Sequence, residues 1–245
     1  MCLLITCDTG GWRTPASLSC VMPKDNSPAA DTIVTSLTPG EPDRHAYLAA
    51  RTIARLSGGF LLVNPWRGDF VDVGRSSRHR GLFPPSIRKL DESTRQTILE
   101  EIYHPFRRQV RRRLSDMLLQ HPYVVHISVR TFEPRTDAGQ WRRGDVGLAY
   151  DPAREDEVDW CLDLIDEMWE ATPELKIRRN YPRRGTQDSL TRTMRRHFEE
   201  LNYLGIELML NRAWASRGVS LRDEALIALA EAIGTVSNVD VQQAA

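Results

Sequence analysis

The stretch "CLLITCDTGGWRTP", residues 2–15, joins an apolar run to a polar turn. Its first six residues, 2–7, are apolar enough and short enough to form one buried strand. Asp8 and Thr9 follow at once, and Gly10 and Gly11 then allow the chain to turn tightly. Open α/β sheets bind ligands where their parallel strands end. The stretch therefore predicts an α/β protein whose first strand leads into a ligand site.

Further apolar runs predict the remaining strands, and amphipathic patterns between them predict helices. Strands are expected at 60–64, 69–73, 123–129, 146–150 and 205–211, and helices at 44–56, 91–119, 155–171 and 221–233. Pro105 lies inside the second of these helices and should kink or split it. The alternation of strands and helices predicts a three-layer α/β/α fold with a mostly parallel mixed sheet.

The composition favours one soluble domain over residues 1–245. The 33 basic and 33 acidic side chains cancel, so no overall field attracts nucleic acid or a membrane. The four cysteines form no CxxC pair, which argues against a disulfide framework or a zinc–thiolate site. The first residues lack the basic leader of a signal peptide, so we expect a cytoplasmic protein. The polar stretch 22–42 is predicted to be a loop, and the tail from about residue 236 to fray.

Acidic and basic side chains recur near the ends of the predicted strands. They are Asp8, Asp72, Arg75, Arg130 and Glu207. Such a set is typical of a ligand site, and salt-bridged strand ends that bind nothing are the alternative. The stretch "IRRNYPRRG", 177–185, adds a compact group of donors that suits a carboxylate, since an arginine can bind one through two parallel hydrogen bonds.

Several stretches, in order along residues 3–212, resemble the N-formylglutamate amidohydrolase family. "ITCDTGGWRTP" is similar to the family pattern C-E-H-G-G-N-x-V-P, "FVDVGRS" to V-D-x-N-R-S, and "ILEEIYHPFRRQV" to I-x-x-x-Y-Y-x-P-Y-R. "VVHISVRTFEP" resembles H-I-S-V-H-S-F-T-P, and "RGDVGLAYDPAR" resembles D-V-G-L-L-Y-D-P. "IRRNYPRRGTQDSLT" and "YLGIELMLNR" resemble R-x-N-x-P-Y-x-G-x-x-D-G-L-T and Y-x-G-I-E-L-E-V-N-Q. The resemblance implies a zinc-carboxypeptidase-like fold and metal-assisted hydrolysis of a formylated acidic amino acid.

The same resemblance implies roles for individual residues. The family's zinc is held by a His of the opening motif, a carboxylate and a His of the strand motif, and these positions hold Thr9, Asp43 and Arg130. Glu207 falls on the acid expected to act as general base, and Asp8 and Asp72 line the site. The residues that fall on positions expected to bind the substrate carboxylate or a developing oxyanion are Arg75, Arg179 and Asn180.

The two His replacements point away from zinc. A Thr hydroxyl is a poor zinc ligand, and an Arg does not lose its proton to become one. Arg130 is predicted to lie between Asp43 and Glu207 and to take over the electrostatic role of the ion. We therefore expect no cofactor, with zinc only where His45 or His104 replaces a lost ligand.

Three functions follow as hypotheses. The first is a pseudoenzyme or ligand-binding homologue that takes a small acidic or N-acylated amino acid. The second is an active amidohydrolase with a rearranged site, in which Asp8, Asp43, Asp72 and Glu207 hold a hard cation such as Mg²⁺ or Mn²⁺. The third is a nucleic-acid or protein scaffold that uses the arginines of 107–113. The flanking Glu100, Glu101 and Asp116 dilute the positive charge that would follow a phosphate backbone. Neither a membrane nor a nucleic acid is an expected partner.

Overall fold

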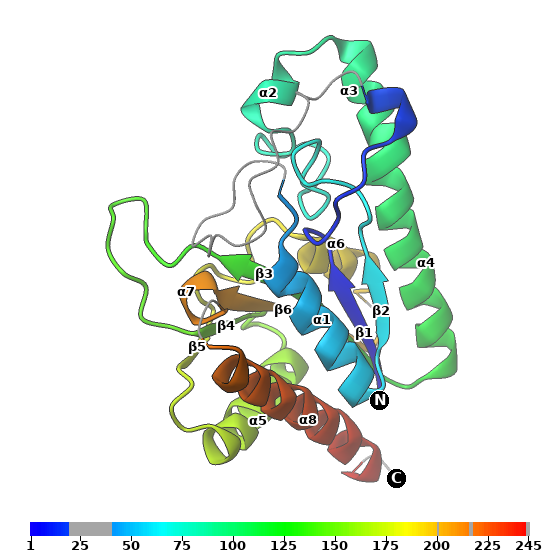
Figure 1. The fold of residues 1–245 in the computed structure, drawn as a ribbon. Helices are drawn as coiled ribbons and strands as arrows, with labels where there is room; N and C mark the ends of the chain where they lie inside the picture. Colours follow the sequence, from blue (N-terminus) through cyan, green and yellow to red (C-terminus); the bar gives the residue numbers. More distant parts are fainter. Residues whose placement is uncertain (20–40, 200, 216–217, 244–245) are drawn as a thin grey trace.

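A mixed sheet forms the middle layer of the molecule (Figure 1). The computed structural model describes residues 1–19, 41–199, 201–215 and 218–243. In the order β2-β1-β3-β6-β4-β5, the strands are Phe60–Val63, Cys2–Cys7, Val124–Phe132, Tyr203–Asn211, Val146–Ala149 and Ile177–Arg179. Neighbouring strands are parallel except for β4 and β6, which are antiparallel. The predicted α/β class with a mostly parallel mixed sheet is confirmed.

Helices cover both faces of this sheet. One face packs against α1 (Arg44–Ser57), α5 (Glu155–Ala171) and α8 (Val219–Gln243). The other packs against α4 (His104–Gln120) and α6 (Leu190–His197). Shorter segments complete the described chain: η1 (Ala16–Leu18), α2 (Pro85–Arg88), α3 (Glu92–Ile98), the π-helix η2 (Leu99–Tyr103) and α7 (Arg212–Ala215). The result is the expected three-layer arrangement.

Local sequence accounts for the ends of α1. The Asp43 side chain accepts a hydrogen bond from the Ala46 backbone N–H at 3.1 Å, which satisfies one of the otherwise unpaired donors of the first turn. The helix stops at Gly58, whose φ of 72° is left-handed and suits glycine. Asp43, which the family resemblance predicts to be a metal ligand, therefore serves as the N-cap of α1.

The sequence misassigned some elements. Residues 69–73 do not form a strand; Phe70, Val71 and Val73 are buried because they pack against the apolar side of α4, without pairing with a strand. Strand β5 and helix α6 were not predicted, and the helix expected at 221–233 continues to Gln243. Most of the predicted loop 22–42, up to residue 40, lies outside the described residues.

The register of the central strands locates the polar residues on the α4/α6 face. Thr6 of β1, Ser128 of β3 and Glu207 of β6 are aligned across three strands. Because side chains alternate along a strand, Asp8 and Arg130 lie on the same face, two residues nearer the carboxyl ends. In the described part of the chain no helix is both long and apolar enough to cross a membrane.

Candidate functional site

Arg130 joins two acids at the carboxyl ends of the strands. Its Nε lies 2.9 Å from Oδ1 of Asp8, and its Nη2 lies 2.5 Å from Oδ2 of Asp8 and 2.7 Å from Oδ1 of Asp72. The Asp8 side chain is only 1% exposed and that of Arg130 14%. The predicted arginine salt bridge is present, but its predicted partners, Asp43 and Glu207, were wrong.

A glycine turn is shaped around this guanidinium. A Cβ on Gly74 would lie 2.0 Å from Nη2 of Arg130 and 2.6 Å from Oδ2 of Asp8, so a larger residue would displace the guanidinium from Asp8. The Gly74 N–H donates to Oδ1 of Asp72 at 3.0 Å, and the Asp72 N–H donates to the carbonyl of Leu82 at 2.9 Å. The turn that contains Asp72 and Gly74 therefore holds Asp72 against Arg130, although no strand does so.

Burial and opposite charge compete in this cluster. Burial lowers the pKa of Arg130, but Asp72 and Asp8 outweigh it and raise that pKa well above its ordinary value. Burial would raise the pKa of Asp72, yet Arg130 and then Arg75 leave it lowered. Burial raises the pKa of Asp8, and Arg130 offsets part of that rise. Arg130 thus stays charged and compensates two acids in a place with little water.

Glu207 has a different arginine partner. Arg183 donates from Nη2 to Oε2 of Glu207, and the Thr191 hydroxyl donates to Oε1 at 3.2 Å. The Glu207 side chain is 2% exposed. Both carboxylate oxygens of the residue expected to be the general base are therefore engaged within the chain.

The segment after β5 crosses β4 and carries Arg183 to this place. A Cβ on Gly147 would lie 1.8 Å from the carbonyl oxygen of Tyr181, and one on Gly185 would lie 2.3 Å from the Tyr150 backbone nitrogen. Sequence reasoning missed Arg183. A signal was available, because Arg183 stands where the quoted pattern R-x-N-x-P-Y-x-G has a Tyr.

Arg75 completes a group of three guanidiniums. Its Nε lies 3.3 Å from Oδ2 of Asp72, and its Nη1 donates to the backbone carbonyl of Asp188 at 3.1 Å. Arg183 donates to the same carbonyl at 3.0 Å. Burial lowers the pKa of Arg183, and although Glu207 opposes this, the nearby charges of Arg130 and Arg75 lower it further. The predicted site residues Arg75, Arg130, Asp8 and Asp72 are thus brought together, with Glu207 joined to them through Arg183.

Asp43 and Thr9 lie beside this network with separate partners. The Asp43 backbone N–H donates to the carbonyl of Thr9 at 2.9 Å. The Thr131 hydroxyl donates to Oδ2 of Asp43, and Nη2 of Arg212 lies 3.9 Å from the same oxygen. Oγ1 of Thr9 and Nδ1 of His45 are buried and have no hydrogen-bond partner among the described residues.

The predicted substrate residue at the end of β5 is placed differently from expectation. In the sheet register Arg179 is aligned with Leu148 and, through it, with Leu208, the residue after Glu207. Its side chain therefore belongs to the face opposite Glu207, and the assignment of Arg179 to this site is corrected. Arg178, aligned with Gly147 and Met209, lies on the Glu207 face.

Asn180 has a structural role at this turn. Its φ is 48°, and its Oδ1 accepts from the Gly185 N–H at 2.8 Å and from the Tyr150 N–H at 3.4 Å. An Asn tolerates the left-handed backbone and can bond the chain that follows it. Asn180 thus stabilises the turn that leads to Arg183, and its side-chain Oδ1 already accepts hydrogen bonds from two backbone N–H groups.

The donor set does not fit a zinc ion. Zinc is usually held by three protein ligands, with an open fourth position in catalytic sites. Within the described ranges, no group of three or more His, Cys, Asp or Glu side chains could hold a metal. Asp8, Asp72 and Glu207 each contact a guanidinium, and His104 instead lines a cavity between α4 and α6.

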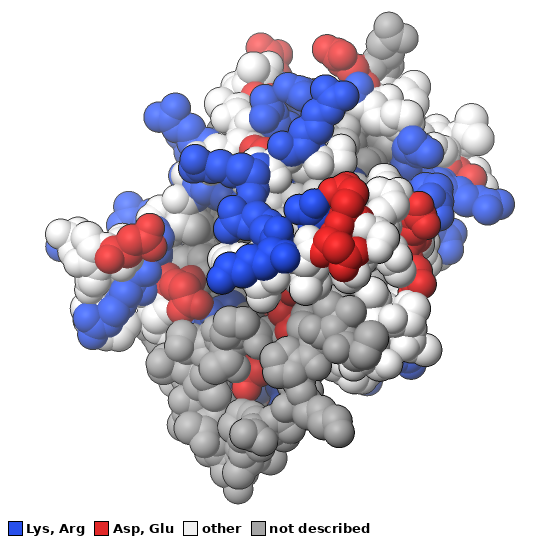
Figure 2. Space-filling model, turned by 90° about the horizontal axis from the view of Figure 1, so that it is seen from above, with Lys and Arg blue, Asp and Glu red and all other residues white. Residues whose placement is uncertain are grey.

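The arrangement favours binding of an anion. Seen from above, Lys and Arg side chains gather near the middle of the upper face, with Asp and Glu among them (Figure 2). The Arg75 side chain is 30% exposed while two of its nitrogens are anchored. A guanidinium fixed in this way can offer its remaining N–H groups to a carboxylate at little entropic cost.

Comparison with solved structures gives the same fold. Gene product Atu2144 from Agrobacterium tumefaciens is 20% identical, with a TM-score of 0.73 over 97% of this chain and 91% of that one. The N-formylglutamate amidohydrolase from Ralstonia eutropha JMP134 is 14% identical, with a TM-score of 0.66 over 96% of this chain and 93% of that one. A comparison with curated proteins found no match. The family model described as N-formylglutamate amidohydrolase matches residues 1–213. Since this match spans most of the sequence, the chain belongs to the N-formylglutamate amidohydrolase family.

Proposed function

We propose that this member of the family binds a small acidic or N-acylated amino acid and does not hydrolyse it by zinc chemistry. The observation that carries the proposal is that Asp8, Asp72 and Glu207 are each paired with an arginine of the same chain. Arg130 holds Asp8 and Asp72, and Arg183 holds Glu207. A general base must accept a proton from a water molecule, and each oxygen of Glu207 already accepts a hydrogen bond within the chain, one of them from the charged Arg183, which competes with a water molecule.

The ligand carboxylate is assigned to Arg75 and Arg178. Arg75 is anchored by Asp72 and by the carbonyl of Asp188, so its free N–H groups are held in one direction. Arg178 lies on the same face of the sheet and is exposed. Two arginines suit the two carboxylates of an N-acylated glutamate or aspartate.

Calorimetric titration tests this proposal. We expect saturable binding of N-formylglutamate or glutamate by the unmodified protein, weakened about tenfold or more by Arg75→Ala, which removes a charge-assisted hydrogen bond. Arg178→Ala should weaken binding, while its neighbour Arg179→Ala, on the opposite face, is the matched control and should not. Absence of binding at millimolar ligand, or equal loss in the two neighbouring variants, would contradict the proposal.

A second candidate is a metal-dependent amidohydrolase rebuilt around Asp43. It is favoured by the buried Oγ1 of Thr9 and Nδ1 of His45, which find no partner in the part of the chain that the structure describes and belong to residues beside Asp43. Release of formate from N-formylglutamate, measured with added Zn²⁺, Mn²⁺ or Mg²⁺, distinguishes the two functions. Turnover that depends on a metal and is lost in His45→Ala supports this second candidate, and binding without turnover supports the first.

A further inference from the structure

A cavity of about 440 Å³ lies between α4 and α6, beside the turn at Ser76 and Ser77. Its wall on α4 carries His104, Arg107, Arg108 and Arg111, and its wall on α6 carries Thr193, Met194 and His197. No described residue that lines it is acidic. Its volume falls within the range of small-molecule sites, about 300–1,000 Å³. The cavity is therefore large enough for a small metabolite, and the hydrogen-bond donors of its arginines and histidines suit an anionic one.

The arginines of this cavity differ in what they already bind. Nη1 of Arg107 donates to the carbonyls of Val73 at 2.9 Å and Arg75 at 3.0 Å, and its guanidinium lies 5.2 Å from the ring centre of Tyr103. Burial lowers the pKa of Arg107, with Tyr103 the first of the groups that oppose this. Arg107 is thus a fixed cation that has lost part of its hydration, and a nearby anion would stabilise its charge.

Arg108 and Arg111 have no such anchors. Both are exposed, three residues apart on one helix, and no acid among the described residues pairs with either. Residues at this spacing share a helix face, so their like charges repel each other. A bound anion would relieve that repulsion, and planar guanidiniums match the oxygens of a phosphate group.

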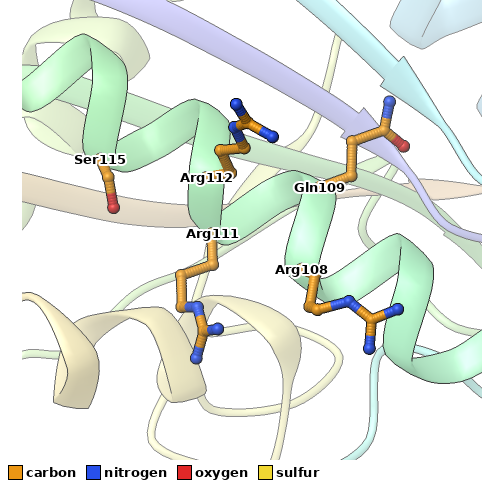
Figure 3. Close-up of a pocket in the computed structure, with 5 residues that line it drawn as sticks. All are labelled: Arg108, Gln109, Arg111, Arg112 and Ser115. Atoms are coloured by element: carbon orange, nitrogen blue, oxygen red, sulfur yellow. The ribbon is translucent and has the colours of Figure 1, made fainter.

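A second cavity continues the first along α4. It measures about 410 Å³ and shares Arg108 and Arg111 with its neighbour, adding Gln109, Arg112 and Ser115 (Figure 3). In the close-up, Arg108, Arg111 and Ser115 extend from one side of α4, and Gln109 and Arg112 from the other. Arg108 and Arg111 border both cavities, so they could bind a ligand that has more than one anionic group and extends from one cavity into the other.

This place is separate from the Arg130 site. The Arg75 side chain turns away toward Asp72 and Asp188, and the Ser76 N–H donates to Oδ2 of Asp188 at 2.9 Å, so the turn lies between the two sites. We propose that the groove between α4 and α6 binds a phosphate-bearing small molecule with at least two anionic groups, gripped by Arg108 and Arg111. The zero net charge of the chain favours this compact ligand over a nucleic acid, which needs an extended basic surface.

Calorimetric titration with inorganic pyrophosphate at constant ionic strength tests the proposal. Saturable binding of one pyrophosphate is expected, and the double variant Arg108→Ala, Arg111→Ala should weaken it about 100-fold, roughly tenfold for each arginine. The matched control is Arg51→Ala, Arg55→Ala on α1, which removes the same charge from another exposed helix surface and should leave the affinity within about twofold. Thermal unfolding of both variants checks that they fold.

Three results would overturn it. One is the absence of saturable binding at millimolar pyrophosphate, and another is an equal loss of affinity in the α1 control, which would mean a general charge effect. The third is competition from a single-stranded RNA of twelve nucleotides that binds more tightly than pyrophosphate and with a steep salt dependence, which would make the groove a nucleic-acid surface. If N-formylglutamate binds, pyrophosphate should not compete with it, because the two sites are separate. If N-formylglutamate does not bind, the pyrophosphate titration of the unmodified protein and of the two double variants still decides this proposal.

Discussion

Arg130 contacts both carboxylate oxygens of Asp8, a residue 122 positions earlier in the chain, and reaches Asp72 with the same Nη2. The contact fastens the end of β3 to the end of β1 and to the turn before Gly74. An arginine therefore stands near the place where the family resemblance puts a metal ion, and it binds acids that the resemblance did not count among the ligands.

Removal of this arginine should destabilise the fold. Arg130→Ala leaves Asp8 buried and unpaired, so the free energy of unfolding should fall by about 3–5 kcal/mol at pH 7. Urea denaturation measures the loss. The deficit should shrink as the pH falls toward 4, because the variant raises the folded-state pKa of Asp8 and a protonated Asp8 needs no counter-charge. The double variant Asp8→Asn, Arg130→Gln removes both charges and should lose much less; a loss as large as that of Arg130→Ala would argue against the ion pair as the cause.

Histidines at the two replaced positions should restore metal binding. Thr9→His together with Arg130→His puts imidazoles at the two positions where the family resemblance expects histidine and removes the fixed positive charge. We expect close to one zinc per chain by plasma emission spectrometry after dialysis, against little in the unmodified protein. Thr9→His alone keeps Arg130 and is the control, expected to stay metal-poor. Stoichiometric zinc in the unmodified protein would refute the proposal that arginine excludes it.

Gly147 should tolerate no side chain. A Cβ there would meet the Tyr181 carbonyl at 1.8 Å, so Gly147→Ala should displace the segment that carries Arg183 and cost about 2–4 kcal/mol of unfolding free energy. Gly68→Ala is the matched control, since nothing lies within 4 Å of its added Cβ, and it should change stability by less than about 0.5 kcal/mol. If the two variants lost equal stability in thermal denaturation, the close approach of the Tyr181 segment to β4 would not be the reason that position 147 requires glycine.

His126 should make the protein sensitive to acid. Burial, with a smaller contribution from Arg195, lowers the pKa of His126 to about 3, and its two ring nitrogens lie 2.8 Å from Oγ1 of Thr6 and from the Tyr203 hydroxyl. The unfolded chain takes up a proton near its ordinary pKa of about 6.5, whereas the folded chain does not until about pH 3. The unfolding free energy should therefore fall by about 1.4 kcal/mol per pH unit as the pH drops below 6.5.

Denaturation of the His126→Gln variant between pH 4 and 7 checks this origin. Gln keeps a polar side chain at the position without a group that titrates in this range. The slope due to His126 should disappear in the variant, even though the variant is less stable at pH 7. An unchanged slope would assign the acid sensitivity to other groups.

The sequence predicted the strands and helices whose apolar pattern is uninterrupted, such as β1 and α5. It failed at residues 69–73, where an apolar run is buried by turns and not by a sheet, because periodicity reports burial and not hydrogen bonding. Strand β5, Ile177–Arg179, was missed because its three residues are mostly polar and lie at the sheet edge.

The site was predicted in part for similar reasons. Position near the end of a predicted strand located Asp8, Arg130, Asp72 and Arg75, although the strand predicted at 69–73 is not formed. Which arginine meets which acid depends on strand order and on close approaches at glycines, which no local pattern encodes. Arg130 was therefore given the wrong partners, and Arg183 was overlooked.

The π-helix Leu99–Tyr103 determines which side of α4 faces the core. Buried side chains recur at every fourth residue from Ile98 to Leu114, and in a regular α-helix each such step overshoots a full turn by about 40°. The wider π turn holds one extra residue, which rotates the following helix back by about 100° and cancels that much of the accumulated rotation. Deletion of one residue from this turn would rotate the rest of α4 by the same angle, turning Arg108 and Arg111 out of the groove and Val110 out of the core.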